Sequence, residues 1–443
     1  MSAFTQHFCQ AIAQVDPLLG MGRVKEVVGL VAEAEGIKLP VGSGVFLELP
    51  AGEPALGEVV GFRGERMLIM PYAETRGFAP GGLVYQARHE GMVRVGQGLL
   101  GRVIDGMGRP LDGRGDYQYD RLAPLHRDPP SAMERPRISD PVDVGVRVLN
   151  GLLTLGKGQR MGIFAGSGVG KSTLMSMIAR HTAADVSVVA LVGERGREVR
   201  DFIERDLGPE GLKRSVVVVA TSDQPALVRM RSAYLATAIA EHFRDLGADV
   251  VLMMDSVTRF ALAGREVGLS IGEPPTTKGY TPSVFAALPR LLERAGTGAN
   301  GGSITGLYTV LVEGDDVTEP VSDAMRSILD GHVVLTRALA DQGYYPAVEV
   351  MGSVSRVCPD VNPPDVLTAG YRLREMVAAF RRAEDLINIG AYVKGSNPVV
   401  DRAIKNIDRI KAYLTQPTDQ RADLASSRKM LLELVDAAWG KKK

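Results

Sequence analysis

The chain has 443 residues, of which 45% are hydrophobic and 23% are charged. Lysine plus arginine and aspartate plus glutamate number 52 each, so no net charge attracts the chain to nucleic acid or to an anionic membrane. This composition excludes a disordered, collagen-like or disulfide-stapled protein, and the length predicts two or three domains.

The N-terminal segment predicts a short amphipathic helix within residues 1–20. Phe4, Phe8 and Ile12 recur at helical spacing before Pro17, and this apolar stripe faces either the protein's own body or a partner. No basic segment followed by an apolar run opens the chain, and no stretch approaches the roughly 18 apolar residues of a membrane span. We therefore expect a cytoplasmic protein whose membrane contact is peripheral.

Residues 21–95 predict a small β-barrel. Three β-rich runs, at 27–31, 45–49 and 67–70, are separated by glycine and proline. A segment rich in glycine, proline and aspartate follows at 101–141, and its turn signals without periodicity are typical of a linker.

Residues 96–360 predict an α/β domain with a parallel sheet, because apolar runs alternate with long helical segments. The runs lie at 161–165, 187–192, 216–221, 250–254 and 303–312. Beyond residue 361 helical periodicity replaces the strands, with predicted helices at 371–388, 399–415 and 422–438. Residues 361–443 are therefore expected to form a C-terminal helical domain. Cys9 and Cys358 lie far apart with no CxxC pattern, which supports neither a disulfide nor a zinc site.

The strongest chemical signal is a glycine-rich loop between a predicted strand and a predicted helix. It reads Ala165, Gly166, Ser167, Gly168, Val169, Gly170, Lys171, Ser172 and Thr173. This is the pattern of a Walker A loop, in which backbone N–H groups surround phosphates, the lysine reaches the outer phosphates and the serine ligates Mg²⁺. Ala165 replaces the first glycine of the strict pattern, and the alternative reading is a glycine-rich turn without a ligand.

Two carboxylates follow predicted strands of the same sheet. Asp255 ends the apolar run 250–254, which makes it a Walker B candidate that holds magnesium, although many buried strands end at an acidic helix cap. Glu194 follows the run 187–192, where it could orient and deprotonate the attacking water. The alternative for Glu194 is a surface ion pair with Arg195 or Arg197.

The segment from about residue 101 to 356 resembles the rotary ATPase superfamily. The resemblance is carried by Gly-Glu-Arg-Gly-Arg-Glu at 193–198, Asp-Ser-Val-Thr-Arg-Phe at 255–260, Gly-Tyr-Thr-Pro-Ser-Val-Phe at 279–285, Tyr-Pro-Ala-Val-Glu at 345–349 and Ser-Val-Ser-Arg at 353–356. It implies a β-barrel, a RecA-like P-loop nucleotide domain and a C-terminal helical domain in this order.

Within that superfamily the chain is similar to the flagellar type III export ATPases. Two segments carry this narrower resemblance, Gly-Gly-Ser-Ile-Thr at 301–305 and Ile-Gly-Ala-Tyr-Val-Lys-Gly-Ser-Asn-Pro at 389–398. The second stands where catalytic subunits of the proton-driven synthase carry an acidic run, which this chain lacks. The family consists of cytoplasmic homo-hexamers that hydrolyse ATP with Mg²⁺.

The resemblance implies a role for each matching residue. Glu194 corresponds to the water-activating carboxylate, and Arg195 and Arg259 to second-line phosphate contacts. Arg356 matches the arginine finger that crosses into the neighbouring subunit's site, and its alternative is an ordinary salt bridge. Tyr345 matches the aromatic that stacks on adenine, with a half-buried core tyrosine as the alternative. Glu349 and Thr418 depart from the family pattern near the base and bear on nucleotide selectivity.

The same resemblance implies partners. The helix within residues 1–20 matches the segment that holds a stator-like regulator, and the loop at 392–397 matches the contact with a central coiled-coil stalk protein. An export gate in the inner membrane, with substrates and chaperones, completes the expected set, and no nucleic acid is expected. The alternatives are an injectisome ATPase, a rotary synthase subunit, a hexameric RNA or DNA translocase, and an inactive structural ring.

Overall fold

The computed structural model describes residues 20–50, 52–87, 91–312 and 319–440. The predicted helix with Phe4, Phe8 and Ile12 lies outside these residues. The chain divides into two compact units, of which the first contains Met1–Met92 together with Pro225–Leu227 and Glu266–Pro274. Of the helices in the described part of the chain, none combines the length and the apolar character that crossing a membrane requires.

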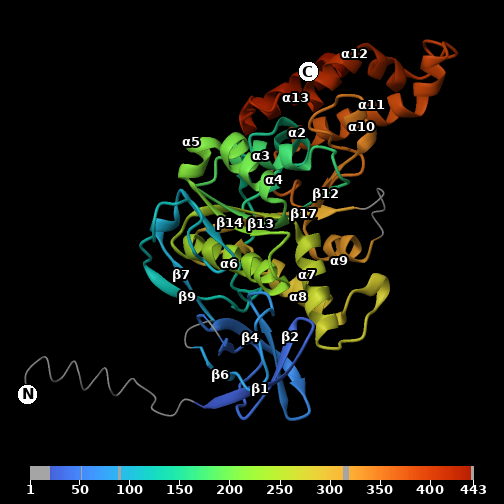
Figure 1. Ribbon diagram of the computed structural model, residues 1–443. Coiled ribbons are helices and arrows are strands. Elements are labelled where there is room, and N and C mark those ends of the chain that lie inside the picture. Colours follow the sequence, from blue (N-terminus) through green and yellow to red (C-terminus); the bar gives the residue numbers. More distant parts are fainter. Residues whose placement is uncertain (1–19, 51, 88–90, 313–318, 441–443) are drawn as a thin grey trace, which may run out of the picture. The chain divides into compact units, whose positions relative to one another are not determined.

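Six antiparallel strands of the first unit close into a barrel, coloured blue in Figure 1, as the sequence predicts. In chain order they are β1 (Met21–Val28), β2 (Val31–Glu35), β3 (Gly44–Leu47), β4 (Ala55–Arg63), β5 (Arg66–Pro71) and β6 (Leu83–Gln86). Alternate side chains point inward, and Val24, Val45 and Ile69 form part of a fully buried core.

The prediction of one barrel strand is wrong. The β-rich run at 27–31 is not a single strand but the turn between β1 and β2, which pair with Val28 opposite Val31. Gly29 has a φ of 57°, in the left-handed region that a tight hairpin turn requires and that glycine adopts without strain. The apolar neighbours of Gly29 therefore hid the turn.

A nine-stranded, mostly parallel sheet forms the centre of the second unit, as predicted for a P-loop nucleotide domain. The order is β19-β18-β12-β17-β15-β13-β14-β8, with β16 (Gly296–Thr297) paired to β17. The strands are β8 (Arg102–Asp105), β12 (Arg160–Ala165), β13 (Val186–Glu194), β14 (Ser215–Thr221), β15 (Asp249–Asp255), β17 (Ser303–Leu311), β18 (Gly331–Leu335) and β19 (Val354–Ser355). Two short pairs lie outside this sheet, β7 (Met92–Val95) with β9 (Arg121–Pro124) and β10 (Pro141–Val142) with β11 (Leu155–Gly156).

Helices cover both faces of the sheet, and the strands are apolar on both sides for that reason. In β13, Val189 and Leu191 pack into the core shared with α3 (Lys171–His181). Val188 and Ala190 pack into the core shared with α6 (Ala226–Asp245) and α8 (Pro282–Leu292). The helices are α2 (Arg147–Leu152), α3 (Lys171–His181), α4 (Gly196–Asp201), α5 (Gly208–Lys213), α6 (Ala226–Asp245), α7 (Val257–Ser270), α8 (Pro282–Leu292), α9 (Pro320–Ile328) and α10 (Arg337–Asp341). A π-helical segment, Phe202–Leu207, joins α4 to α5, and two single 3₁₀ turns lie at Gln97–Leu99 and Thr277–Gly279.

The segment 101–141 is more than a linker, which corrects the sequence interpretation. Its strand β8 pairs with β14 and forms one edge of the large sheet. Further along, Arg294 donates to both carboxylate oxygens of Glu241 and to the Leu125 carbonyl oxygen at 2.8 Å, which ties the segment to α6. Four residues among turn signals are too few for periodicity to reveal a strand.

Three helices form the C-terminal region, at the red end of the colour bar in Figure 1. They are α11 (Pro364–Asn388), α12 (Pro398–Leu414) and α13 (Leu424–Trp439). Asn397 and Asp423 cap α12 and α13 through side-chain bonds to backbone N–H groups. These helices share a buried core with α2 and belong to the same compact unit as the sheet.

Candidate functional site

The glycine-rich loop lies between β12 and α3, as the sequence predicts. Ala165 is the last residue of β12 and is 1% exposed, so its methyl group packs in the core. The departure from the strict Walker A pattern therefore lies in the strand, outside the loop that would approach a ligand. A cavity of about 970 Å³ opens beside the loop and is lined by residues that include Gly166, Ser167, Gly168, Gly170, Lys171, Ser172 and Thr173. Val169, in the same loop, is fully buried.

Two carboxylates and one lysine converge at the carboxyl edge of the sheet. β13 and β15 are neighbours with Leu191 opposite Asp255, which brings Glu194 at the end of β13 close to Asp255 at the end of β15. Lys171 Nζ forms an ion pair with Asp255 Oδ1 and lies 3.6 Å from Glu194 Oε1. The three side chains are between 8% and 10% exposed, so each charge is largely shielded from water.

The Asp255 carboxylate is also held by Thr309, which sequence reasoning missed. Thr309 lies on β17, the other neighbour of β15, and its hydroxyl donates to Asp255 Oδ1 at 2.7 Å. The residue is fully buried. A threonine inside an apolar strand carries no local signal of this contact, because only the strand order places β17 beside β15.

Burial is the main cause that raises the pKa of Glu194 to about 7, and the nearby charge of Asp255 acts in the same direction. Lys171 and Arg259 oppose this shift through their positive charges. Glu194 is therefore a carboxyl group that gains or loses its proton near neutral pH, as expected of a general base in a cleft.

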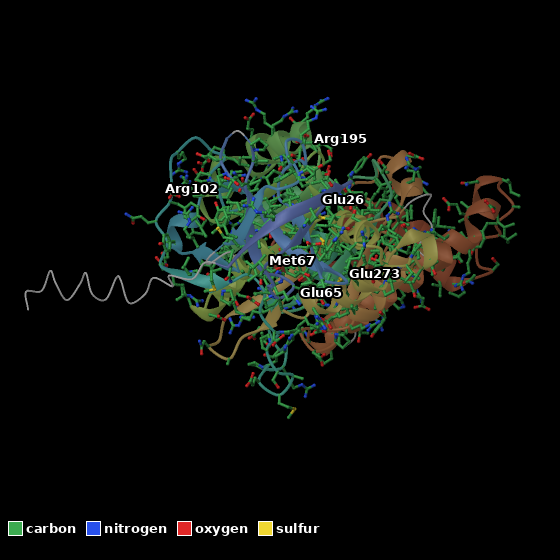
Figure 2. All side chains as sticks on the ribbon, turned by 60° about the horizontal axis from the view of Figure 1, so that its bottom comes forward. Glu26, Glu65, Met67, Arg102, Arg195 and Glu273 are labelled. Atoms are coloured by element: carbon green, nitrogen blue, oxygen red, sulfur yellow. The ribbon has the colours of Figure 1, made fainter. Side chains whose placement is uncertain are left out.

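Arginines surround the cavity in different ways. Arg259 lines it from α7. The side chain of Arg195 is 77% exposed, lies at the molecular surface in Figure 2 and pairs with Glu198 at 3.1 Å. Arg337, which the sequence interpretation did not select, donates to the Ser167 carbonyl oxygen at 2.8 Å and so holds the loop from α10.

Tyr345 lies beside the end of the loop. A Cβ atom built on Gly170 would be 3.4 Å from the Tyr345 ring, so the small residue permits this close approach. The tyrosine is 41% exposed, and its carbonyl oxygen accepts from the Gln416 N–H at 2.9 Å. Glu349 pairs with Arg381 of α11 at 2.7 Å, which connects this segment to the C-terminal helices.

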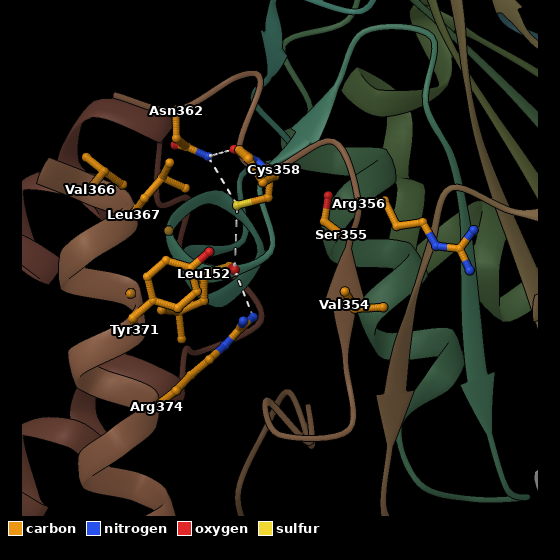
Figure 3. Close-up of a pocket in the computed structure, with 13 residues that line it drawn as sticks. Leu152, Val354, Ser355, Arg356, Cys358, Asn362, Val366, Leu367, Tyr371 and Arg374 are labelled. Atoms are coloured by element: carbon orange, nitrogen blue, oxygen red, sulfur yellow. Dashed lines mark hydrogen bonds between the residues drawn. The ribbon is translucent and has the colours of Figure 1, made fainter. Parts of the chain in front are cut away.

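Arg356 does not join this constellation within the chain. It is exposed, follows β19 and lines a different cavity of about 290 Å³. Figure 3 shows its side chain directed away from Tyr371 and Arg374 on the opposite wall. No carboxylate among residues 20–50, 52–87, 91–312 and 319–440 forms an ion pair with its guanidinium, so the alternative of an intramolecular salt bridge has no support there.

The donor set beside the loop fits magnesium. Mg²⁺ prefers oxygen ligands and is bound by one or two carboxylates together with substrate phosphates and water, without a full protein cage. Asp255 and the exposed Ser172 hydroxyl supply such oxygens on adjacent elements. Within the described ranges, no group of three or more histidine, cysteine, aspartate or glutamate side chains could hold a metal by itself.

Comparisons with known proteins agree with the fold. Residues 145–355 match the model described as the ATP synthase alpha/beta family, nucleotide-binding domain. Residues 363–433 match the T3SS EscN ATPase C-terminal domain.

Two relatives illustrate the similarity in sequence. The chain is 53% identical to the flagellum-specific ATP synthase of Bacillus subtilis over 97% of this chain and 99% of that protein. It is 49% identical to the type 3 secretion system ATPase of Xanthomonas euvesicatoria over 94% of both chains.

Solved structures are similar over nearly the whole chain. The assembled ATPase EscN from the enteropathogenic E. coli type III secretion system has a TM-score of 0.89 at 43% identity, covering 94% of this chain and 100% of that chain. EscN in complex with its central stalk EscO has a TM-score of 0.86 at 42% identity, with the same coverage.

Proposed function

The chain belongs to the family of flagellum-specific ATP synthases and type III secretion ATPases, and we propose that it hydrolyses ATP in a homo-hexameric ring that energises export of flagellar proteins. The observation that carries this proposal is the convergence of Lys171, Glu194 and Asp255 beside a Walker A loop. A binding module without turnover has no need of a buried carboxylate poised near neutral pH.

In the proposed reaction the loop binds the triphosphate. The N–H groups of residues 166–173, in the loop and in the first turn of α3, direct positive charge toward the phosphates, and Lys171 contacts the outer ones. Phosphate oxygens thereby compete with Asp255 and Glu194 for the lysine. Ser172 and Asp255 would hold Mg²⁺, which when bound neutralises charge on the phosphate oxygens.

Glu194 is the proposed general base. Its carboxylate orients a water molecule and accepts a proton from it while the water oxygen attacks the terminal phosphorus. The bond between that phosphorus and the bridging oxygen breaks, and ADP and phosphate are the products. Arg259 and Arg195 are proposed as additional phosphate contacts, Arg259 from within the cavity and Arg195 from its exposed rim. Tyr345 would stack on the adenine from its place beside Gly170.

Arg356 completes the site of the neighbouring subunit in this proposal. It is exposed, it has no carboxylate partner among the described residues, and it does not line its own subunit's loop cavity. In related systems, a guanidinium placed against the charge that develops on the phosphate in the transition state raises the rate of hydrolysis about a thousandfold or more. An isolated protomer should therefore be nearly inactive.

Membership of this family also indicates the proteins that the ring would bind. We propose a coiled-coil stalk protein at the turn between α11 and α12, where Ile389 and Val393 are 74% and 71% exposed. The solved EscN complex holds its central stalk EscO. A stator-like regulator would bind the segment 1–20, and the ring would act in the cytoplasm, bound peripherally to the inner membrane at the export gate, on substrates and chaperones but not on nucleic acid.

A second candidate is the injectisome ATPase of virulence-type secretion. It is favoured by the match of residues 363–433 to the EscN C-terminal domain and by the TM-score of 0.89 with assembled EscN. The flagellar reading is preferred because the relative with 53% identity over 97% of this chain is a flagellum-specific protein. Restoration of motility in a flagellar deletion strain, against restoration of effector secretion in an injectisome deletion strain, separates the two.

The experiment that tests the ring is the ATPase rate per subunit, measured against protein concentration together with mass from light scattering. We expect a steep rise in specific activity as the hexamer forms. Full specific activity in a monomeric sample would overturn the proposal of a finger supplied in trans.

A further inference from the structure

The segment that ends in Arg356 is fastened to the sheet of its own subunit. β19 is a two-residue strand paired antiparallel to β18, with Gly331 opposite Ser355 and His332 opposite Val354. Immediately beyond it, the Arg356 N–H donates to the Asp330 carbonyl oxygen at 3.0 Å. Just before the strand, Ser353 Oγ accepts from the Val334 N–H of β18 at 2.9 Å. These few contacts are a short anchor for a side chain that must be placed accurately.

Ser355 adds to this anchor through a buried hydroxyl. Its Oγ donates to the Thr154 carbonyl oxygen at 2.9 Å and accepts from Gln159 Nε2 at 3.0 Å. Ser355 is 7% exposed, and Gln159 and Thr154 are fully buried, so water does not replace these bonds.

Gln159 connects this anchor to the strand that carries the Walker A loop. It immediately precedes β12, which runs to Ala165. Its side-chain amide is fully used: Nε2 also donates to the Asp330 carbonyl oxygen at 3.2 Å, and Oε1 accepts from the Gly156 N–H at 2.9 Å. One end of β12 therefore leads to the subunit's own phosphate loop, and the other end holds the segment of its arginine finger.

The opposite side of the finger segment is loosely packed. A cavity of about 290 Å³ separates residues 354–356 from α11, whose Val366, Tyr371 and Arg374 line its other wall (Figure 3). Dense apolar packing does not position Arg356 from this side, so the hydrogen bonds from the sheet have to do so.

We propose that Gln159 and Ser355 are positioning residues that fix the arginine finger and couple it to the phosphate loop of the same subunit. The inference rests on the proposed role of Arg356 in the neighbouring site. Through Gln159 and Ser355, a displacement of β12 by nucleotide in one subunit would move the Arg356 side chain in the neighbouring subunit's site. This gives the ring a direct route for communication between sites.

The first test compares Ser355→Ala and Gln159→Met with a matched control, Ser215→Ala. Ser215 is also fully buried in the sheet and donates to a backbone carbonyl oxygen, that of Gly211 at 2.7 Å, but it lies on β14. At concentrations where the ring is assembled, both positioning variants should lose tenfold to about a hundredfold in kcat, since misplacement by about 1 Å can cost that much. KM for MgATP should stay within twofold, and the control should match the unmodified protein.

The second test asks in which site the defect lies. Each positioning variant is mixed with Lys171→Ala protein, which cannot use its own loop but carries an intact finger. At shared interfaces the Lys171→Ala subunit supplies Arg356 to the variant's site, so activity per variant subunit should rise at least threefold. Arg356→Ala mixed with Lys171→Ala is the reference, because it depends on the proposed function alone.

The outcomes separate the two proposals. If ATPase activity rises in the reference mixture but not in the Ser355→Ala and Gln159→Met mixtures, the positioning role is overturned. The proposal that Arg356 acts in the neighbouring subunit's site would still stand. Failure of the reference mixture would overturn the finger itself. Loss of folding or ring assembly in both variants, seen by circular dichroism and light scattering, would show that the two residues serve stability and not positioning.

Discussion

Lys171 Nζ lies 3.6 Å from Glu194 Oε1, so the proposed phosphate contact and the proposed general base belong to one shielded cluster. The lysine also pairs with Asp255, so one ammonium group contacts both carboxylates.

Glu194→Gln should preserve ATP binding and abolish turnover. The amide keeps the shape of the side chain but cannot accept a proton, and general bases contribute about 10²- to 10⁴-fold in rate. Equilibrium binding of a fluorescent ATP analogue and steady-state ATPase rates measure the two effects. Glu204→Gln, which alters a 58% exposed partner of Arg200, is the control and should leave both unchanged. Turnover at the unmodified rate in Glu194→Gln would reject this residue as the base.

The pH dependence of kcat/KM should show an acid limb near pH 7. Glu194 must be ionised to act as a base, and its pKa is raised to about 7, mainly by burial, so the active form is lost as the pH falls below that value. Arg259→Gln removes a charge that lowers this pKa, and the limb should then move to higher pH. A limb near pH 4.5 in the unmodified protein would contradict the assignment.

The raised pKa of Glu194 also predicts a pH-dependent effect on the stability of the fold. A carboxyl group whose pKa is raised on folding is favoured in the native state when protonated, so its contribution to stability is lost as the pH rises through the native pKa. Glu194→Gln removes the buried ionised form, and its Tm should exceed that of the unmodified protein at pH 8. The difference should shrink toward pH 5.5 in thermal unfolding followed by circular dichroism. An equal difference at both pH values would count against ionisation as the cause.

Thr309→Val should weaken the response to magnesium. The substitution removes the hydroxyl that donates to Asp255 at 2.7 Å while keeping the shape of the side chain. Loss of a hydrogen bond to a metal ligand typically costs about 10- to 100-fold in metal affinity. The measurement is the Mg²⁺ concentration that gives half-maximal ATPase rate. Thr305→Val is the matched control, since Thr305 is buried on the same strand but accepts from the Gly158 N–H; the same shift in both variants would refute a specific role.

Tyr345→Ala should raise KM for MgATP, whereas Tyr345→Phe should not. Stacking of a base on an aromatic ring is worth about 1–3 kcal/mol, which corresponds to roughly 5- to 150-fold in affinity. Phenylalanine retains the ring beside Gly170, so only the alanine variant loses the contact. Comparison of ATP with free triphosphate as competing ligands gives an independent readout. If Tyr345→Ala weakens both ligands equally, the tyrosine acts on the loop and not on the base.

The barrel and the loop show how far local sequence reasoning reaches. Residues 165–173 are contiguous, so the strand, the glycines, the lysine and the following helix are all visible in one segment. The central strands were equally clear, because burial on both faces leaves continuous apolar runs. The turn at Gly29 could not be recognised, because its neighbours are apolar. The edge strand β8 could not be recognised either, because turn residues surround it.

The sequence by itself determined the class of the domains, their order and the residues that could act on a phosphate. Only the tertiary structure decided which of them meet. Lys171 and Asp255 are 84 positions apart and converge because β12, β15 and β13 end at the same edge of a parallel sheet. Thr309 joins them because β17 lies between β12 and β15, whereas Arg356 lines a different cavity. Strand order arises from the packing of distant segments against one another, and no local pattern of residues encodes it.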